Sequence, residues 1–198
     1  MSNILVELEN ATKNYINISF NLKILKNKKY LIVGPNGSGK TTLLKLLAKY
    51  IKPDQGKIKF YTNNIIYLPD KINLPNNINV KEYIEIIENI KNNRVDYYLF
   101  HHFDIPLTKK ISELSKGNIQ KLILLTSLIN NYDLYLLDEP LNGLDQNSIK
   151  TLNNYILNSN NKTFLIVSHY SNYFEYVDEV INLWIKLLLV ICFQKRIK

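Results

Sequence analysis

Residues Gly34–Thr41 read GPNGSGKT and satisfy the pattern G-x-x-x-x-G-K-[ST]. Glycines let the backbone curl around an anion with its N–H groups pointing inward. A helical pattern follows directly, and the positive end of that helix would face the same anion. The Lys40 ammonium can reach the β- and γ-phosphates of a nucleotide, and the Thr41 hydroxyl can ligate Mg²⁺. The segment therefore predicts a binding site for a nucleoside triphosphate with Mg²⁺.

Two carboxylates, Asp138 and Glu139, follow the apolar run Leu134–Leu137. A carboxylate that ends a strand beside a phosphate-binding loop can hold Mg²⁺, directly or through water, and Asp138 takes that role. Glu139 can polarise the water that attacks the γ-phosphate. Acidic residues after a buried strand are common on their own. Paired with the phosphate-binding loop, they predict hydrolysis of the bound nucleotide.

Three apolar runs of strand length, typical of strands buried on both faces, must position these groups. Each run ends in a residue that could do chemistry: Tyr30–Val33 ends at Gly34, Leu134–Leu137 at Asp138, and Thr163–Val167 at Ser168 and His169. Helical patterns separate the three runs. This order predicts an α/β fold with a mostly parallel central sheet and helices on its faces.

The remaining pattern predicts further strands and helices. Alternation places Ile16, Ile18, Phe20, Leu22 and Ile24 on one face of a strand, after a turn over residues 10–14. The other expected strands are Ile4–Leu8, Lys57–Phe60 and Asn63–Leu68, and the expected helices are Thr41–Lys52, Val80–Lys91, Asp96–Phe103, Ile119–Asn130 and Ser148–Leu157.

The composition of the 198 residues, 46% hydrophobic and 21% charged, excludes a disordered tail and predicts one globular domain. The longest apolar stretch is too short for a membrane-spanning helix, which needs roughly 18 residues. A single cysteine, Cys192, is compatible with the reducing cytoplasm. The positive charge behind the net value of +8 comes almost entirely from lysine. Compositional drift would explain this excess, and so would binding of a polyanion.

Taken together, these motifs resemble those of the ATP-binding subunit of ABC transporters over about residues 3 to 183. Gly34–Thr42 resembles the Walker A motif, and Leu136–Pro140 resembles Walker B. Leu114–Asn118 (LSKGN) looks like a degenerate LSGGQ signature, and Leu144-Asp145 looks like the D-loop. His169 resembles the switch histidine, and Tyr15 stands where the family keeps an aromatic residue that stacks on adenine.

The resemblance implies a P-loop NTPase fold of the ABC ATPase type, with an N-terminal antiparallel β element in addition to the mostly parallel central sheet. It also implies a head-to-tail dimer in which ATP lies between the Walker A of one domain and the signature of the other. Ser115 and Gly117 would contact the γ-phosphate across the dimer, although Ser112 or Ser115 would also cap the following helix. Tyr15 would stack on adenine or, alternatively, pack at a strand edge. The implied catalytic residues are Glu139, His169 and Lys40. The implied nucleotide-binding residues are Tyr15, Gly34, Pro35, Asn36, Gly37, Ser38, Gly39, Lys40, Thr41, Thr42, Ser115, Gly117 and Asp145.

The chain departs from the family pattern at Asp70, which stands where the family usually has a glutamine that contacts Mg²⁺. A carboxylate can still ligate a hard cation, so Thr41, Asp138 and Asp70 form the expected metal-binding set. The signature is also altered, since Lys116 and Asn118 replace glycine and glutamine. We expect a reduced helical subdomain over about residues 72–130, with residues 71–79 as the loop that docks on the membrane partner.

Residues 184–198 form an atypical tail, apolar and then basic. Three interpretations stay open: a last core element, an amphipathic contact with a membrane or partner, or an aberrant end caused by a frameshift.

The expected function is ATP hydrolysis that powers an ABC transporter, with an exporter favoured. The expected partners are a second ABC ATPase domain, most simply in a homodimer, and transmembrane permease subunits at the inner face of the cell membrane. A nucleic-acid partner is not expected. The alternatives are a soluble ABC-type ATPase that acts on nucleic acid or the ribosome, and a hydrolysis-poor partner subunit.

Overall fold

The computed structural model describes residues 3–16, 18–174 and 176–183, so the tail at 184–198 lies outside the described residues. The chain forms two compact units. The described residues of the sheet unit lie within residues 3–68, 132–139 and 160–183. The helical unit takes in residues 69–131 and 140–159.

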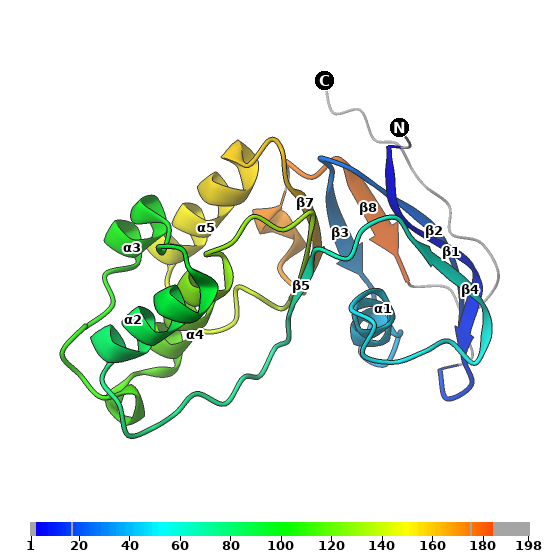
Figure 1. Ribbon diagram of the computed structural model, residues 1–198. Coiled ribbons are helices and arrows are strands. Elements are labelled where there is room, and N and C mark those ends of the chain that lie inside the picture. The colour runs from blue at the N-terminus through cyan, green and yellow to red at the C-terminus, as the bar shows by residue number, and fades with distance from the viewer. Residues whose placement is uncertain (1–2, 17, 175, 184–198) are drawn as a thin grey trace. The chain divides into compact units, whose positions relative to one another are not determined.

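A five-stranded parallel sheet lies at the centre of the sheet unit (Figure 1). Its order is β5-β6-β7-β3-β8, and its strands are β3 (Lys29–Val33), β5 (Ile65–Leu68), β6 (Leu134–Asp138), β7 (Thr163–Val167) and β8 (Glu179–Asn182). All residues of β6 and β7 are buried, as their continuous apolar runs predicted. Strand β8 was missed, because only Ile181 of its four residues is buried.

A second, antiparallel sheet of order β2-β1-β4 contains β1 (Ile4–Lys13), β2 (Ile18–Leu25) and β4 (Gln55–Phe60). The alternation predicted for β2 is confirmed, since Phe20, Leu22 and Ile24 are buried between exposed polar residues. The turn predicted over residues 10–14 was wrong in part. Strand β1 continues to Lys13 through an irregular register after Leu8, where Asn10 adopts a φ of 49°.

Helix α1 (Lys40–Leu47) packs its leucines into a core that also takes side chains from both sheets. Each fully buried leucine contributes about 1.5–3 kcal/mol relative to an exposed one. The helix ends earlier than the predicted Lys52, because Lys49 turns into the left-handed region at φ 62°. The backbone N–H of Tyr50 then donates to the carbonyl of Lys45 and closes the helix end.

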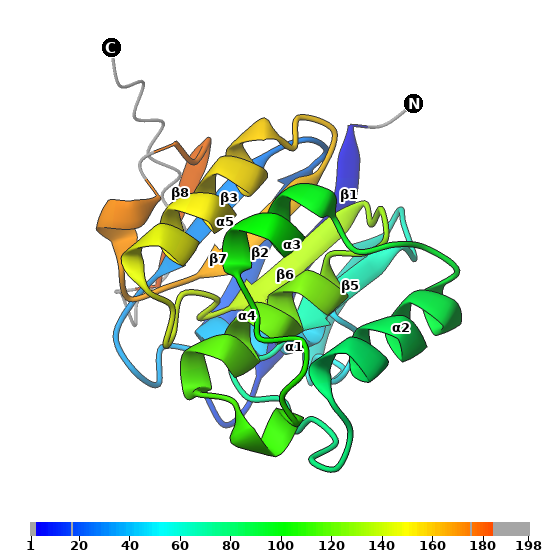
Figure 2. The same cartoon turned by 90° about the vertical axis from the view of Figure 1, so that its left-hand side faces the viewer.

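The helical unit contains α2 (Val80–Lys91), α3 (Tyr97–Phe103), the 3₁₀ turn η1 (Ile111–Glu113), α4 (Lys116–Ser127) and α5 (Gln146–Asn158). Helix α3 packs on α4 and α5, and α2 packs on α4 (Figure 2). The bounds predicted for α2 are confirmed. Helix α4 begins one turn before the predicted Ile119, because Ser115 caps it. Within the described part of the chain, no helix is long and apolar enough to cross a membrane.

Candidate functional site

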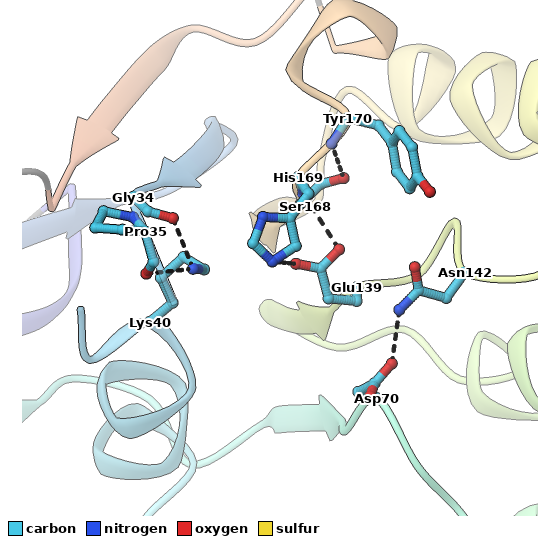
Figure 3. Close-up of polar contacts among 9 residues, drawn as sticks. All are labelled: Gly34, Pro35, Lys40, Asp70, Glu139, Asn142, Ser168, His169 and Tyr170. Carbon is cyan, nitrogen blue, oxygen red and sulfur yellow. Dashed lines mark hydrogen bonds and ion pairs between the residues drawn. The ribbon is translucent and has the colours of Figure 1, made fainter. Parts of the chain in front are cut away.

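The phosphate-binding loop connects β3 to α1 in the sheet unit. Gly39 precedes the helix with a φ of 89°, a conformation that residues with a Cβ rarely adopt. The Lys40 ammonium is buried and donates to the carbonyl oxygens of Gly34 at 2.8 Å and Pro35 at 3.0 Å (Figure 3). These contacts hold the cation at the loop, where it can attract a phosphate.

The loop also fits an anion through the hydroxyl of Ser38. Its oxygen is buried and finds no hydrogen-bond partner among the described residues. A buried polar atom without a partner is destabilising. A phosphate oxygen that accepts a hydrogen bond from this hydroxyl would remove that cost. The Thr41 side chain is exposed in the first turn of α1. The loop therefore offers phosphate donors beside a hydroxyl oxygen suited to Mg²⁺.

Asp138 is the last residue of β6, and only 3% of it is exposed. The Tyr67 hydroxyl, from the neighbouring strand β5, donates to its Oδ2 at 3.3 Å. We did not anticipate Tyr67. The only signal is a tyrosine among the apolar residues of a short strand, and strand pairing is needed to place it beside Asp138. A threonine hydroxyl and a carboxylate are hard oxygen donors, so Thr41 and Asp138 fit Mg²⁺.

Glu139 adopts a φ of 52°, a left-handed conformation rare for a residue with a side chain and often found at functional sites. Its backbone N–H donates to the carbonyl of Val167 at 2.9 Å. The backbone N–H of His169 donates to Oε2 of Glu139 at 3.2 Å, and the ring Nε2 of His169 lies 3.3 Å from Oε1 of Glu139 (Figure 3). The structure thus brings two of the three predicted catalytic residues, Glu139 and His169, together at adjacent strand ends.

Burial raises the pKa of the Glu139 carboxyl above its ordinary value, and the charge of Asp138 acts in the same direction. The hydrogen bond from the His169 backbone, the His169 ring and Lys40 oppose the rise in that pKa. A carboxylate with a raised pKa holds a proton more tightly, so it is a better general base for water. The side chain of His169 is half exposed and can reach a bound substrate.

Tyr15 lies in the turn between β1 and β2 and is 67% exposed, so the alternative of a packed strand-edge ring was wrong. Its hydroxyl donates to Oγ1 of Thr42 at 3.5 Å, and the Lys13 ammonium lies 5.7 Å from the ring centre. The ring therefore stands near the first turn of α1 with area for stacking on a flat, apolar group.

The signature residues lie in the helical unit at the start of α4. Ser115 caps the helix, since its Oγ accepts the backbone N–H of Asn118 at 3.2 Å. A Cβ at Gly117 would stand 2.5 Å from the carbonyl oxygen of Gly143. Close packing therefore requires glycine at position 117, whatever its part in phosphate binding. This reason was missed, because it depends on a residue 26 positions later in the chain.

Asp145 caps α5 and also forms an ion pair. Its Oδ1 accepts the backbone N–H of Ser148 at 2.9 Å and the Ser148 hydroxyl at 3.0 Å. Its Oδ2 lies 2.7 Å from the ammonium of Lys121 on α4. The Lys121 contact, helped by Ser148, lowers the pKa of Asp145 to about 2. Lys121 was not anticipated, although a lysine inside the apolar run of α4 is a usable signal.

Asp70 belongs to the helical unit, where its Oδ1 accepts Nδ2 of Asn142 at 2.8 Å (Figure 3). Thr41 and Asp138, the other two expected metal ligands, belong to the sheet unit. The structure thus gives Asp70 a protein partner, Asn142, that the sequence analysis did not foresee.

Comparison with known proteins agrees with this arrangement. The family model for the ABC transporter matches residues 17–142. The zinc import ATP-binding protein ZnuC of Rickettsia conorii is 35% identical over 85% of this chain and 78% of its own length. The spermidine/putrescine import ATP-binding protein PotA of Fusobacterium nucleatum is 33% identical over 71% of this chain and 43% of its own length.

The fold comparison points the same way. A putative ABC transporter ATP-binding protein from Pyrococcus furiosus matches with a TM-score of 0.72 and 26% identity, over 90% of this chain and 96% of its own. The chain that matches this family therefore contains a phosphate-binding loop, a buried carboxylate at a strand end, and a contact between Glu139 and His169. The chain belongs to the ABC transporter family and is an ATP-binding subunit of such a transporter, an ATPase.

Proposed function

We propose that Glu139 is the general base of ATP hydrolysis in this chain. The observation that carries the proposal is the double contact between Glu139 and His169, which aims a buried carboxylate from the end of β6. His169 holds the carboxylate in place and hydrogen-bonds the γ-phosphate with its exposed ring. Lys40 stabilises the negative charge that develops on the transferred phosphoryl group.

The remaining nucleotide contacts follow from the same loop. The backbone of Gly34–Gly39 and the hydroxyl groups of Ser38 and Thr42 bind the phosphates, and Tyr15 stacks on adenine. Thr41 and Asp138 hold Mg²⁺, with Asp70 as a third candidate ligand. The ion would supply positive charge that offsets the negative charge of the phosphates. Hard oxygen ligands from two different segments suit that ion.

We further propose that two copies of the chain act together across their nucleotides. Ser115 and the backbone of Gly117 begin α4, whose N-terminal end suits an anion. They would complete the site of the partner copy, with Asp145 near the same nucleotide. Residues 71–79, mostly exposed, are the proposed docking loop for a transmembrane permease subunit, which would bring the chain to the inner face of the membrane.

The direction of transport we propose is import, and the proposed cargo is a metal ion. The support is the naming of the relatives, since ZnuC is a zinc import protein and PotA a polyamine import protein. Our expectation of an exporter has no such support. Co-purification from membranes, followed by mass spectrometry, would first identify the permease partner of this chain. Cells that lack their own zinc-import ATPase should then accumulate more zinc when they produce this chain together with that permease. A fall in cellular zinc would indicate export.

Substitution Glu139→Gln tests the assignment of the base. We expect hydrolysis to fall by about 10²–10⁴-fold, because the amide cannot accept the proton of water. ATP affinity should stay near the parent value, since the phosphate-binding loop is unchanged. Phosphate release and equilibrium binding of ATP measure the two quantities. Glu85→Gln, an exposed position on α2, is the matched control. Retention of full turnover by Glu139→Gln would exclude Glu139 as the base.

A further inference from the structure

Residues Pro140–Asp145, here called the tethered loop, follow Glu139 directly in the chain. Two hydrogen bonds hold the loop within the helical unit. Nε2 of Gln120 on α4 donates to the carbonyl of Pro140 at 3.3 Å, and Nδ2 of Asn142 donates to Asp70 at 2.8 Å. The last residue of the loop, Asp145, is held by the ion pair with Lys121 at 2.7 Å. The loop is therefore fixed near both ends and at its centre.

Among these contacts, the ion pair between Lys121 and Asp145 is the strongest. Lys121 is only 8% exposed and belongs to a stretch of α4, residues 120–126, that is buried throughout. A buried ammonium is costly unless it is paired and hydrogen-bonded, and Asp145 supplies that pair. Ser148 occupies the other carboxylate oxygen of Asp145 through two hydrogen bonds. Both oxygens of Asp145 are thus engaged inside its own chain.

The packing between α4 and the tethered loop leaves little freedom for relative movement. A Cβ at Gly117 would meet the carbonyl oxygen of Gly143 at 2.5 Å. The aliphatic stem of Lys116 lies over Gly143, since a Cβ at Gly143 would stand 3.4 Å from its Cγ. The start of α4, which carries the signature, and the tethered loop are therefore expected to move together.

We propose that Lys121 is a positioning residue for ATP hydrolysis, because it fixes Asp145 and with it the loop that begins next to Glu139. The inference rests on the proposed function in one respect, the assignment of Glu139 as base. Glu139 holds a left-handed backbone conformation that surrounding contacts must maintain. A loop released at Asp145 would transmit its freedom to that backbone through Pro140.

The loss should appear in kcat and not in KM for ATP. Lys121 touches Asp145, which we place near the nucleotide of the partner copy, whereas the groups proposed to bind most of the ATP molecule, the phosphate-binding loop and Tyr15, belong to other segments of the chain. Small errors in the placement of a reacting group can cost up to about 100-fold in rate. For Lys121→Met we expect a fall of about 10-fold in kcat, the smaller value because Gln120 and Asp70 still hold the tethered loop.

The test is a double-mutant cycle on the full chain with ATP and Mg²⁺. Its members are Lys121→Met, Asp145→Asn and the double variant, with Lys121→Arg as the conservative rescue. Methionine fills the buried space without the charge, and asparagine keeps an oxygen that can cap α5. Lys150→Met, at an exposed position on α5, is the matched control. Each variant is measured for kcat, KM and thermal stability.

Support requires three results: a lower kcat with KM unchanged, recovery of most of the loss in Lys121→Arg, and no further loss in the double variant. Two results would overturn the proposal. One is parent-like kcat in Lys121→Met despite a lower melting temperature, which would make the pair merely structural. The other is an equal loss from Asp145→Asn in both backgrounds, as expected if Asp145 acts directly on the nucleotide. Failure of Glu139→Gln to stop hydrolysis would remove the base assignment alone, since the cycle decides separately on Lys121.

Discussion

The two units of the chain hold their functional groups in different ways. In the sheet unit, Asp138, Glu139 and His169 follow buried parallel strands, and backbone geometry sets their directions. In the helical unit, Ser115, Asp145 and Asp70 sit at helix starts or in loops, and side-chain contacts hold them. The sheet unit keeps the family pattern, whereas the helical unit departs from it at Asp70, Lys116 and Asn118. Positions held by side-chain contacts depend on distant residues, such as Asn142 for Asp70 and Lys121 for Asp145, so a single substitution can release them.

Among the substitutions that compare the two units, Lys40→Met in the sheet unit should have the largest effect. The buried ammonium is the only cation of the phosphate-binding loop, residues 34–41, and it lies over two loop carbonyls. We expect turnover to fall by about 10²–10³-fold, because charge in the transition state loses a preorganised partner. Steady-state phosphate release measures the loss. Lys116→Ala in the helical unit is the contrasting variant, and an equal loss there would remove the difference between the units.

Gly117→Ala should have the next largest effect, and it tests whether packing alone can make a signature position essential. The new methyl group would overlap the carbonyl oxygen of Gly143, so α4 or the tethered loop must shift. We expect a loss of about 1–3 kcal/mol in the free energy of unfolding together with lower turnover. Chemical denaturation and ATP hydrolysis measure the two effects. Unchanged stability would show that the helical unit yields more easily than its packing indicates.

A smaller effect is expected at Asp70, where two explanations compete. If the hydrogen bond to Asn142 is its task, Asp70→Asn keeps an acceptor oxygen and Asn142→Ala should be the more harmful change. We expect turnover in Asn142→Ala to fall by about 2- to 10-fold, the range of one hydrogen bond. If Asp70 is a metal ligand, Asp70→Asn alone should raise the Mg²⁺ concentration needed for half-maximal activity. Titration of both variants with Mg²⁺ separates the explanations.

The smallest effect concerns pH. Lys121 and Ser148 lower the pKa of Asp145 from 3.8 to about 2, so its ionised form stabilises the folded chain above pH 3.8. That contribution falls as the pH drops from about 4 through about 2. Because Asp145 is 56% exposed, screening limits the gain to about 1 kcal/mol or less. Unfolding of the parent and of Asp145→Asn should differ above pH 5 and converge near pH 2. A constant difference down to pH 2 would contradict the ion pair.

The sequence pattern was sufficient to predict most of the sheet unit, because burial on both faces leaves a continuous apolar run followed by its chemical group. The parallel sheet and the phosphate-binding loop follow from that pattern, whereas the contact between Glu139 and His169 was seen only in the structure. Strand β8 was not predictable in this way, since a strand with one buried residue has no distinctive pattern. Helix ends shifted where a single left-handed residue or cap decided them, as at Lys49 and Ser115.

Contacts between distant segments were beyond prediction from one sequence. Tyr67 meets Asp138 only because β5 pairs with β6, and Lys121 meets Asp145 only because α4 lies against the tethered loop. Periodicity along the chain states which face is buried, but it does not state what that face packs against. The contacts of Tyr67 and Lys121 are therefore differences between the observed site and the site that the sequence predicted.

The strand order has a consequence for how the protein is made. Strand β7 lies between β3 and β6 in space, yet it is the last of the three in the chain. A growing chain that has emerged only as far as β6 has the phosphate-binding loop and Glu139, but it has neither His169 nor the strand that joins them. Such non-local pairing is slow and leaves strand edges exposed until it is complete. Synthesis of residues 163–169 is therefore the step at which the nascent chain first becomes able to form its ATP site.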